Sequence, residues 1–187
     1  MTPQVLRAGV RWLQLRDASL PPGQWLQHLE AWTGQEAALE VVVNGGPGWA
    51  REAGLGAHLK AAQPSLPASG RVRWPLLGRS VHDPEETRRA VADQPDYLVA
   101  GPVYPTTAKP GHDGIGTVGL AEIVEAAVGV PVLAVGGLTP ARVAEIASAG
   151  ASGVAVLSGI TAAVEPARGA RDYLEALERV FLPANTG

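Results

Sequence analysis

The feature of this sequence that most constrains its fold is an alternation of short apolar runs, rich in β-branched residues, with amphipathic stretches. Most of the runs are continuously apolar, which is typical of strands in a parallel sheet covered on both faces. The strand candidates are residues 10–16, 39–44, 56–59, 74–81, 96–103, 130–135 and 153–157. This order predicts an α/β fold, and its regular spacing favours a (β/α)8 TIM barrel-like parallel barrel over an open sheet.

The number of strands is one short of a complete barrel. Seven are visible, and the 187 residues fall below the usual lower limit of roughly 200 for this fold. Residues 2–8 predict a helix that leads into the first visible strand, so the missing strand is expected before residue 1. Three alternatives stay open: an incomplete barrel, a neighbouring chain that fills the gap, or a true start further upstream. Residues 1–187 are expected to form a single domain, and the gap makes a homo-oligomer a further expectation.

The helix candidates between the strands are marked by their N-terminal residues. The segment Asp83-Pro84-Glu85-Glu86 supplies an N-cap, a proline at the first helical position and acids in the first turn. A helix is therefore predicted from there to about residue 92. The other candidates are residues 22–33, 47–53, 118–127, 139–149 and 166–180.

Composition excludes several classes of function. With Cys 0, the chain has no disulfide, no thiolate metal site and no cysteine nucleophile. The formal net charge of −3 predicts no general affinity for nucleic acid or an anionic membrane. No apolar run reaches the roughly 18 residues of a membrane span, and no signal peptide opens the chain, so a cytoplasmic location is expected. Positive charge is placed almost entirely as arginine, which makes the two lysines, Lys60 and Lys109, worth close attention.

Polar residues stand where the first four predicted strands end. In a parallel barrel these carboxyl ends and the loops after them form the site. The candidates are Gln14, Arg16, Asn44, His58, Ser80 and His82. The two-residue period of a strand places Gln14 with Arg16, and Ser80 with His82, on one face. We expect these side chains to contact a ligand, with Arg16 binding an anion; a surface ion pair with Asp17, a plain turn after Asn44 and a purely structural His58 are the alternatives.

The segment after the fifth strand is the most informative. Residues 101–111 form a long loop with rigid prolines, the hydroxyls of Thr106 and Thr107, and Lys109. Such a loop at a barrel mouth is typical of a lid, and we call residues 101–111 the lid loop, or the lid. We expect Lys109 to neutralise a phosphate, a diphosphate or a carboxylate; an ordinary surface loop is the alternative.

Two glycine-bearing turns end the last two strands. Gly136-Gly137 and Ser158-Gly159 expose backbone N–H groups at the start of predicted helical segments, where the helix dipole favours an anion. The last two loops of these barrels are the recurrent phosphate site. The pair of turns therefore predicts phosphate binding.

Taken together in chain order, the strand ends and loops described above resemble those of one protein family. The strings that carry the resemblance are Gln14-Leu15-Arg16, Gly56-x-His58-Leu59, Ser80-Val81-His82, G-P-V-Y-P-T-x-x-K-P at 101–110, Ala134-Val135-Gly136-Gly137 and Gly153-Val154-Ala155-Val156-x-Ser158-x-Ile160. Over roughly residues 10 to 160 the chain resembles the thiamine phosphate synthase and thiazole tautomerase (TenI-type) superfamily.

The resemblance implies a definite chemistry for the synthase branch. That enzyme joins a hydroxymethylpyrimidine diphosphate to a thiazole phosphate and releases diphosphate, with Mg²⁺ and basic groups stabilising the leaving group. By position in the family, the pyrimidine and diphosphate side would comprise Gln14, Arg16, Asn44, Ser80, Thr106 and Lys109. Gly136, Gly137 and Ser158 would hold the thiazole phosphate.

The departures from the synthase pattern are also informative. Gly45 follows Asn44 where the synthase has an aspartate, and Gln63 aligns with its second metal carboxylate. Asp17 and Ala18 replace a basic residue, and Ala108 replaces a threonine. Mg²⁺ prefers carboxylate oxygens beside phosphates, so binding in the usual manner is not expected.

The tautomerase branch lacks those carboxylates too, and its reaction needs only proton transfer and a phosphate anchor. Residues 76–82 favour that branch, although Pro102 stands where it carries a histidine. We therefore expect a thiamine-biosynthesis barrel protein that binds a thiazole phosphate, with TenI-type tautomerisation favoured. A true synthase that also takes a pyrimidine diphosphate, a non-catalytic homologue and another phosphate-binding barrel enzyme are the alternatives.

The expected site follows from this interpretation. The predicted catalytic residues are His82, Lys109 and Ser80, since an unperturbed histidine titrates near neutral pH and can carry a proton. The predicted substrate-binding residues are Gln14, Arg16, Asn44, His58, Thr106, Gly136, Gly137, Ser158 and Gly159. No metal site is predicted, and Mg²⁺ is expected only in a true synthase.

Overall fold

The computed structural model describes residues 1–16, 27–28, 31, 39–66 and 74–182. Its sheet has seven strands, ordered β1 to β7 as in the sequence, and every neighbouring pair is parallel. The strands are β1 (Trp12–Leu15), β2 (Glu40–Asn44), β3 (Gly56–Leu59), β4 (Leu77–Val81), β5 (Tyr97–Ala100), β6 (Val132–Val135) and β7 (Gly153–Ala155). The predicted parallel α/β architecture is confirmed.

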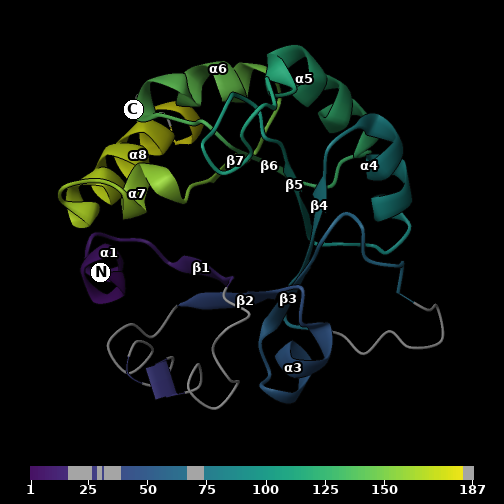
Figure 1. Ribbon diagram of the computed structural model, residues 1–187, viewed down its shortest axis with the longest axis horizontal. Coiled ribbons are helices and arrows are strands. Elements are labelled where there is room, and N and C mark those ends of the chain that lie inside the picture. The colour runs from purple at the N-terminus through teal and green to yellow at the C-terminus, as the bar shows by residue number, and fades with distance from the viewer. Residues whose placement is uncertain (17–26, 29–30, 32–38, 67–73, 183–187) are drawn as a thin grey trace, which may run out of the picture.

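Helices lie outside the sheet, which curls into a barrel-like arc (Figure 1). They are α1 (Thr2–Arg7), α3 (Pro47–Glu52), α4 (Pro84–Val91), α5 (Gly116–Ala126), the 3-10 helix η2 (Pro140–Arg142), α6 (Val143–Ser148), α7 (Ser158–Thr161) and α8 (Pro166–Phe181). No helix in the described parts of the chain is long and apolar enough to cross a membrane.

Several predicted element boundaries are wrong. The predicted strand 96–103 pairs only over Tyr97–Ala100, because the chain turns out of the ladder at Gly101 and Pro102 has no N–H to donate. The predicted helix 139–149 begins as a 3-10 turn before α6. The short helix α7 begins at Ser158, where the sequence predicted a helical start without giving its bounds, and most of the predicted helix 22–33 lies outside the described residues.

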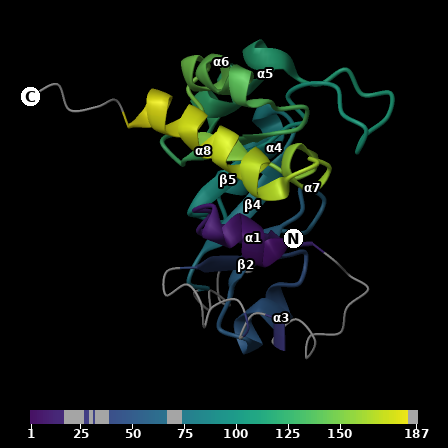
Figure 2. The same cartoon turned by 90° about the vertical axis from the view of Figure 1, so that its left-hand side faces the viewer.

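β1 and β7 are the two ends of the sheet, and no eighth strand joins them among the described residues. On this side α1 packs against α8 (Figure 2). The contact is close, since a Cβ on Gly9 would lie 3.2 Å from Leu174 Cδ1. Helix–helix packing thus brings together the first and last elements of the described chain.

The largest apolar cluster lies between β4–β6 and the helices α4, α5 and α6. Leu98, Leu120, Ile123 and Ile146 are all fully buried there. The cluster fixes α4 over the end of β4, and Asp83 caps that helix as predicted, accepting a hydrogen bond from the Glu86 backbone N–H at 2.7 Å. The core and the cap together determine where the first turn of α4 sits relative to the strand ends.

Candidate active site

The candidate site lies at the carboxyl ends of the strands and in the loops that follow them, an edge that we call the rim. Strand register places Asn44 opposite His58, and His58 opposite Gly78. Because side chains alternate along a strand, Lys60, Ser80 and His82 follow on the same inner face. The residues that the sequence placed at successive strand ends are therefore brought to one edge of the sheet.

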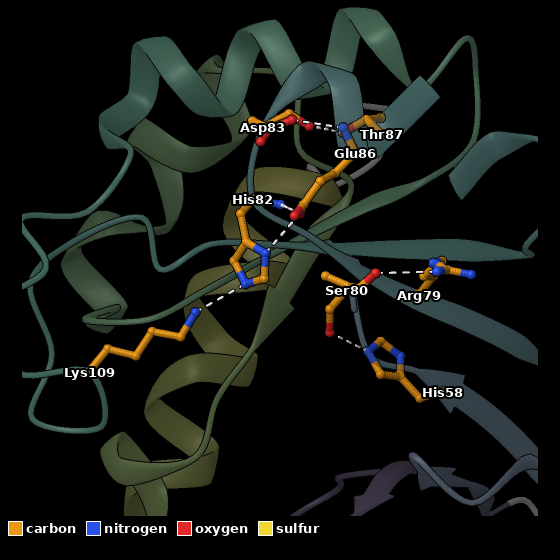
Figure 3. Close-up of polar contacts among 9 residues, drawn as sticks. His58, Arg79, Ser80, His82, Asp83, Glu86, Thr87 and Lys109 are labelled. Carbon is orange, nitrogen blue, oxygen red and sulfur yellow. Dashed lines mark hydrogen bonds and ion pairs between the residues drawn. The ribbon is translucent and has the colours of Figure 1, made fainter. Parts of the chain in front are cut away.

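His58 links two other side chains inside the sheet. Its Nε2 lies 2.8 Å from Ser80 Oγ (Figure 3). Its Nδ1 lies 3.0 Å from Tyr97 Oη. When Tyr97 donates to Nδ1, the Nε2–H donates to Ser80 and leaves the serine hydrogen free for a ligand. His58 is only 1% exposed, so its predicted contact with a ligand would have to pass through Ser80.

Burial keeps the His58 imidazole and the Tyr97 phenol neutral. Desolvation lowers the pKa of His58 to about 4 and raises the pKa of Tyr97, with the charge of Asp96 acting in the same direction. At neutral pH the imidazole is uncharged. His58 therefore orients Ser80 and does not supply positive charge to the site.

Gly78 makes room for the Tyr97 ring, since a Cβ on Gly78 would lie 2.1 Å from Tyr97 Cζ. We expect Gly78→Ala to lower the free energy of unfolding by about 1–3 kcal/mol, the usual cost of overpacking a rigid core. Urea denaturation measures the change. Gly48→Ala is the matched control, because a Cβ on Gly48 meets nothing within 4 Å and the residue lies inside α3, where alanine is the better helix former. Equal stability of Gly78→Ala and the unaltered protein would contradict the expectation.

His82 is held between a carboxylate and an ammonium (Figure 3). Its Nδ1 lies 2.9 Å from Glu86 Oε2, which also accepts the His82 backbone N–H at 2.8 Å. On the other side of the ring, Lys109 Nζ lies 3.0 Å from His82 Nε2. Glu86 therefore fixes the tautomer that carries its proton on Nδ1, and Nε2 is left as an acceptor directed at the lid loop.

A small polar cavity lies beside both networks. It has a volume of about 190 Å³, and its lining includes Ser80, Glu86, Arg79 and Gln63. Arg79 is buried in an ion pair with Asp93 and also donates to the Gln63 carbonyl. The serine held by His58 and the carboxylate that holds His82 thus border one space.

The lid loop and the first glycine turn pack against each other. A Cβ on Gly137 would lie 2.6 Å from the Pro105 carbonyl, and Gly137 has φ +64°, so only glycine fits without strain. Arg142 donates to the Gly137 carbonyl at 2.6 Å and lies over the Tyr104 ring at 3.9 Å. The turn is therefore fixed by its own helix and by the lid.

Tyr173 of α8 contacts both glycine-bearing turns. Its hydroxyl donates to the Leu138 carbonyl at 2.7 Å, and a Cβ on Gly159 would lie 2.2 Å from the same oxygen. A cavity of about 510 Å³ is lined by Leu138, Thr139 and Gly159, among others. The turns that the sequence predicted as one phosphate site are neighbours in space through Tyr173. The cavity is lined by residues that follow the first turn and by Gly159 of the second, together with Glu165 and Asp172.

The residues at the metal positions of the synthase pattern do not fit Mg²⁺. Gly45 offers no ligand, and the side chain of Lys60 packs over it. The Gln63 side chain accepts the Lys60 backbone N–H at 2.6 Å. Within the described ranges, no group of three His, Asp or Glu side chains could hold a metal ion.

The remaining predicted residues differ in exposure. Gln14 is exposed in β1, Arg16 is exposed just after it, and Asn44 is half-buried at the end of β2. Thr106 lies in the lid, where its hydroxyl accepts the Ala108 N–H at 3.3 Å. Ser158 begins α7 and is exposed. Their predicted contacts with a ligand stay predictions.

Sequence reasoning missed Glu86 and Tyr97 as members of the site. Glu86 was interpreted only as an acid in the first turn of a helix. The spacing His82-x-x-x-Glu86 across a strand-to-helix turn was the signal that could have indicated the pair. Tyr97 had no comparable signal, because its place beside His58 depends on the register that sets it against Gly78.

The fold and the rim define a parallel (β/α)-barrel-type protein with its candidate site at the carboxyl ends of the strands. Among solved structures, thiamine phosphate pyrophosphorylase from Pyrococcus furiosus superposes with a TM-score of 0.80 at 28% identity, covering 95% of this chain and 88% of that one. A 3-hexulose-6-phosphate synthase structure superposes with a TM-score of 0.70 at 20% identity, over 93% of this chain and 90% of that one, and shows the fold alone.

Sequence comparison gives the family. The profile described as thiamine monophosphate synthase matches residues 1–160, and the chain belongs to this family. A thiamine-phosphate synthase of Mycobacterium sp. (strain KMS) is 35% identical over 92% of this chain and 82% of its own length. A bifunctional thiamine biosynthesis protein ThiM/ThiE of Symbiobacterium thermophilum is 34% identical over 94% of this chain and 38% of its own length. The predicted resemblance is confirmed.

Proposed function

We propose that this protein binds a thiazole phosphate and catalyses a TenI-type tautomerisation of the thiazole. The observation that carries the proposal is the position of His82 between Glu86 and Lys109 at the rim. A carboxylate–imidazole pair whose second ring nitrogen is unprotonated is suited to moving a proton, and it needs no metal ion.

The geometry supports a simple proton cycle. Once Lys109 turns from His82 toward an anionic group of the substrate, the Nε2 lone pair of His82 accepts a proton from the thiazole ring. The imidazolium that forms is stabilised by the Glu86 carboxylate on Nδ1. The proton is returned to a different ring atom, so the reaction has no net loss or gain of atoms.

The phosphate of the substrate is assigned to the two glycine-bearing turns. Gly136 and Gly137 present backbone N–H groups beside the lid, and Ser158 and Gly159 present theirs at the start of α7. The two turns are joined through Tyr173. A phosphate held there would place the thiazole across the barrel mouth, toward Ser80 and His82.

A true thiamine phosphate synthase is the second candidate, and the names of the relatives favour it. The mycobacterial and Pyrococcus furiosus proteins both carry names for that activity. The side chains at the metal positions argue against a synthase, because Gly45 and Gln63 offer no carboxylate for Mg²⁺. In such a reaction the leaving diphosphate would depend on Arg16 and the lysines instead.

One set of assays separates the candidates. Thiazole tautomerisation is followed by NMR as exchange of ring protons with D₂O, in EDTA. Thiamine phosphate formation is followed with both substrates, with and without Mg²⁺. We expect metal-free tautomerisation; thiamine phosphate formation without tautomerisation would reject the proposal in favour of the synthase. Binding of thiazole phosphate with neither turnover would instead identify a non-catalytic homologue.

A further inference from the structure

The space beside Asn44, where the synthase pattern has a metal-binding aspartate, contains an ammonium group. Gly45 has φ +74°, and a Cβ on it would lie 2.7 Å from Lys60 Cε and 3.3 Å from Lys60 Nζ. The lysine stem therefore crosses directly over the glycine. A side chain at position 45 would have to displace it.

The surrounding hydrogen bonds hold both residues in place. The Gly45 N–H donates to the His58 carbonyl at 2.8 Å. The Lys60 N–H donates to Gln63 Oε1 at 2.6 Å, and the Lys60 carbonyl accepts the Gln63 N–H at 3.0 Å. The backbone of Lys60 is thus fixed by a tight turn, while its ammonium makes no ion pair with any described carboxylate.

An orphaned oxygen belongs to the residue before Gly45. Asn44 Oδ1 is buried and has no hydrogen-bond partner among the described residues. An ammonium carries three N–H donors. The ammonium over Gly45 can therefore direct its donors at a bound anion.

Both lysines of the chain stand on the rim. Lys60 follows β3, and Lys109 comes from the lid to His82 after β4. Ser80 of β4, and His82 just after the end of that strand, lie between them in the order of the sheet. Two ammonium groups therefore flank the strand that carries the proposed proton-transfer residue.

We propose that Lys60, together with Lys109, binds an anionic phosphoryl group directly, in place of a divalent cation. A cation over Gly45 repels a metal ion and attracts the same anion that a metal would bind. The site takes a phosphate or diphosphate from the β2–β3 side of the mouth, opposite the glycine-bearing turns. This proposal rests on the proposed function in one respect only: both assume that the ligand binds at the rim.

Isothermal titration with inorganic pyrophosphate in EDTA tests the proposal. We expect binding without metal, and a loss of at least about tenfold in affinity for Lys60→Met, since one charge-assisted contact is removed. Methionine keeps the stem over Gly45, so the fold is retained. Arg88→Met is the matched control, because it removes one positive charge from an exposed position on α4, and it should bind like the unaltered protein.

A second variant places a carboxylate beside the ammonium. Aspartate is among the residues that tolerate positive φ, and in Gly45→Asp it should pair with Lys60 and weaken pyrophosphate binding in EDTA. Binding that requires Mg²⁺ in the unaltered protein, or equal affinity of Lys60→Met, would overturn the proposal.

Titration with thiazole phosphate distinguishes this proposal from the proposed function. Lys60→Met should bind thiazole phosphate unchanged, because that phosphate is assigned to the glycine-bearing turns. If the unaltered protein binds pyrophosphate as expected but no thiazole phosphate, the metal-free site stands and the proposed function fails. If Lys60→Met weakens the binding of thiazole phosphate as much as the binding of pyrophosphate, a separate anion site on the β2–β3 side is rejected.

Discussion

His82→Gln is expected to lower kcat for thiazole tautomerisation by about 10²–10⁴, the usual contribution of a positioned general base. Glutamine fills a similar volume and can still bond to Glu86, but it has no nitrogen that accepts a proton. The phosphate contacts are assigned to other residues, so the affinity for thiazole phosphate should change little. Steady-state kinetics combined with titration calorimetry separates these two effects.

Two controls make the result specific. Glu86→Gln keeps a hydrogen-bond acceptor for Nδ1 but removes the charge that stabilises the imidazolium. It should lower kcat less than His82→Gln does. His112→Gln is the matched histidine control, because the His112 ring accepts the local Gly114 N–H at 3.0 Å and the backbone bond to the Lys109 carbonyl is kept in the variant. Unchanged kcat in His82→Gln would exclude His82 as the base.

The stability of the protein is expected to fall as the pH drops from about 6.5 to about 4, because of His58. The unfolded chain binds a proton on this residue with the ordinary pKa of 6.5, whereas the buried imidazole has its pKa lowered to about 4. Between these values the unfolded state binds more protons, so the free energy of unfolding decreases with acidification. This difference in pKa corresponds to a loss of about 3 kcal/mol in the free energy of unfolding, and the loss is complete near pH 4.

Urea denaturation at a series of pH values measures this dependence. His58→Gln removes the titrating group and should flatten the slope between pH 4 and 6.5, although its own stability at pH 7 is lower because the bonds to Tyr97 and Ser80 are disturbed. The slope, and not the absolute stability, is the diagnostic quantity. An undiminished slope in His58→Gln would show that another group causes the acid sensitivity.

The order and type of the elements could be predicted from sequence because each strand is a continuous apolar run. Its burial on both faces leaves a clear pattern, as in the fully buried strands β3 and β5. Boundaries were less predictable, because backbone pairing decides where a strand ends. Gly101 and Pro102 are as apolar as the strand before them, yet the strand ends at Ala100. Gly101 still donates to the Val81 carbonyl at 3.3 Å, and Pro102 has no N–H to continue the pairing.

The rim residues were predictable for a different reason. The carboxyl ends of parallel strands share one edge, so Asn44, Ser80 and His82 could be brought together from strand order alone. The contacts between Lys109 and His82, and between Lys60 and Gly45, depend on the path of two loops. Composition singled out the lysines, but only the folded loops show what each of them touches.

The confinement of both lysines to the rim gives the protein an unusual reactivity towards amine reagents. Apart from the α-amino group, Lys60 and Lys109 are the only primary amines in the 187 residues. Acylating agents or aldehydes that modify amines will therefore label side chains only at the mouth, and the α-amino group of Met1 is the one other site of reaction. The extent of acylation at the two lysines, read by mass spectrometry after digestion, is accordingly a direct measure of how far the mouth is occupied.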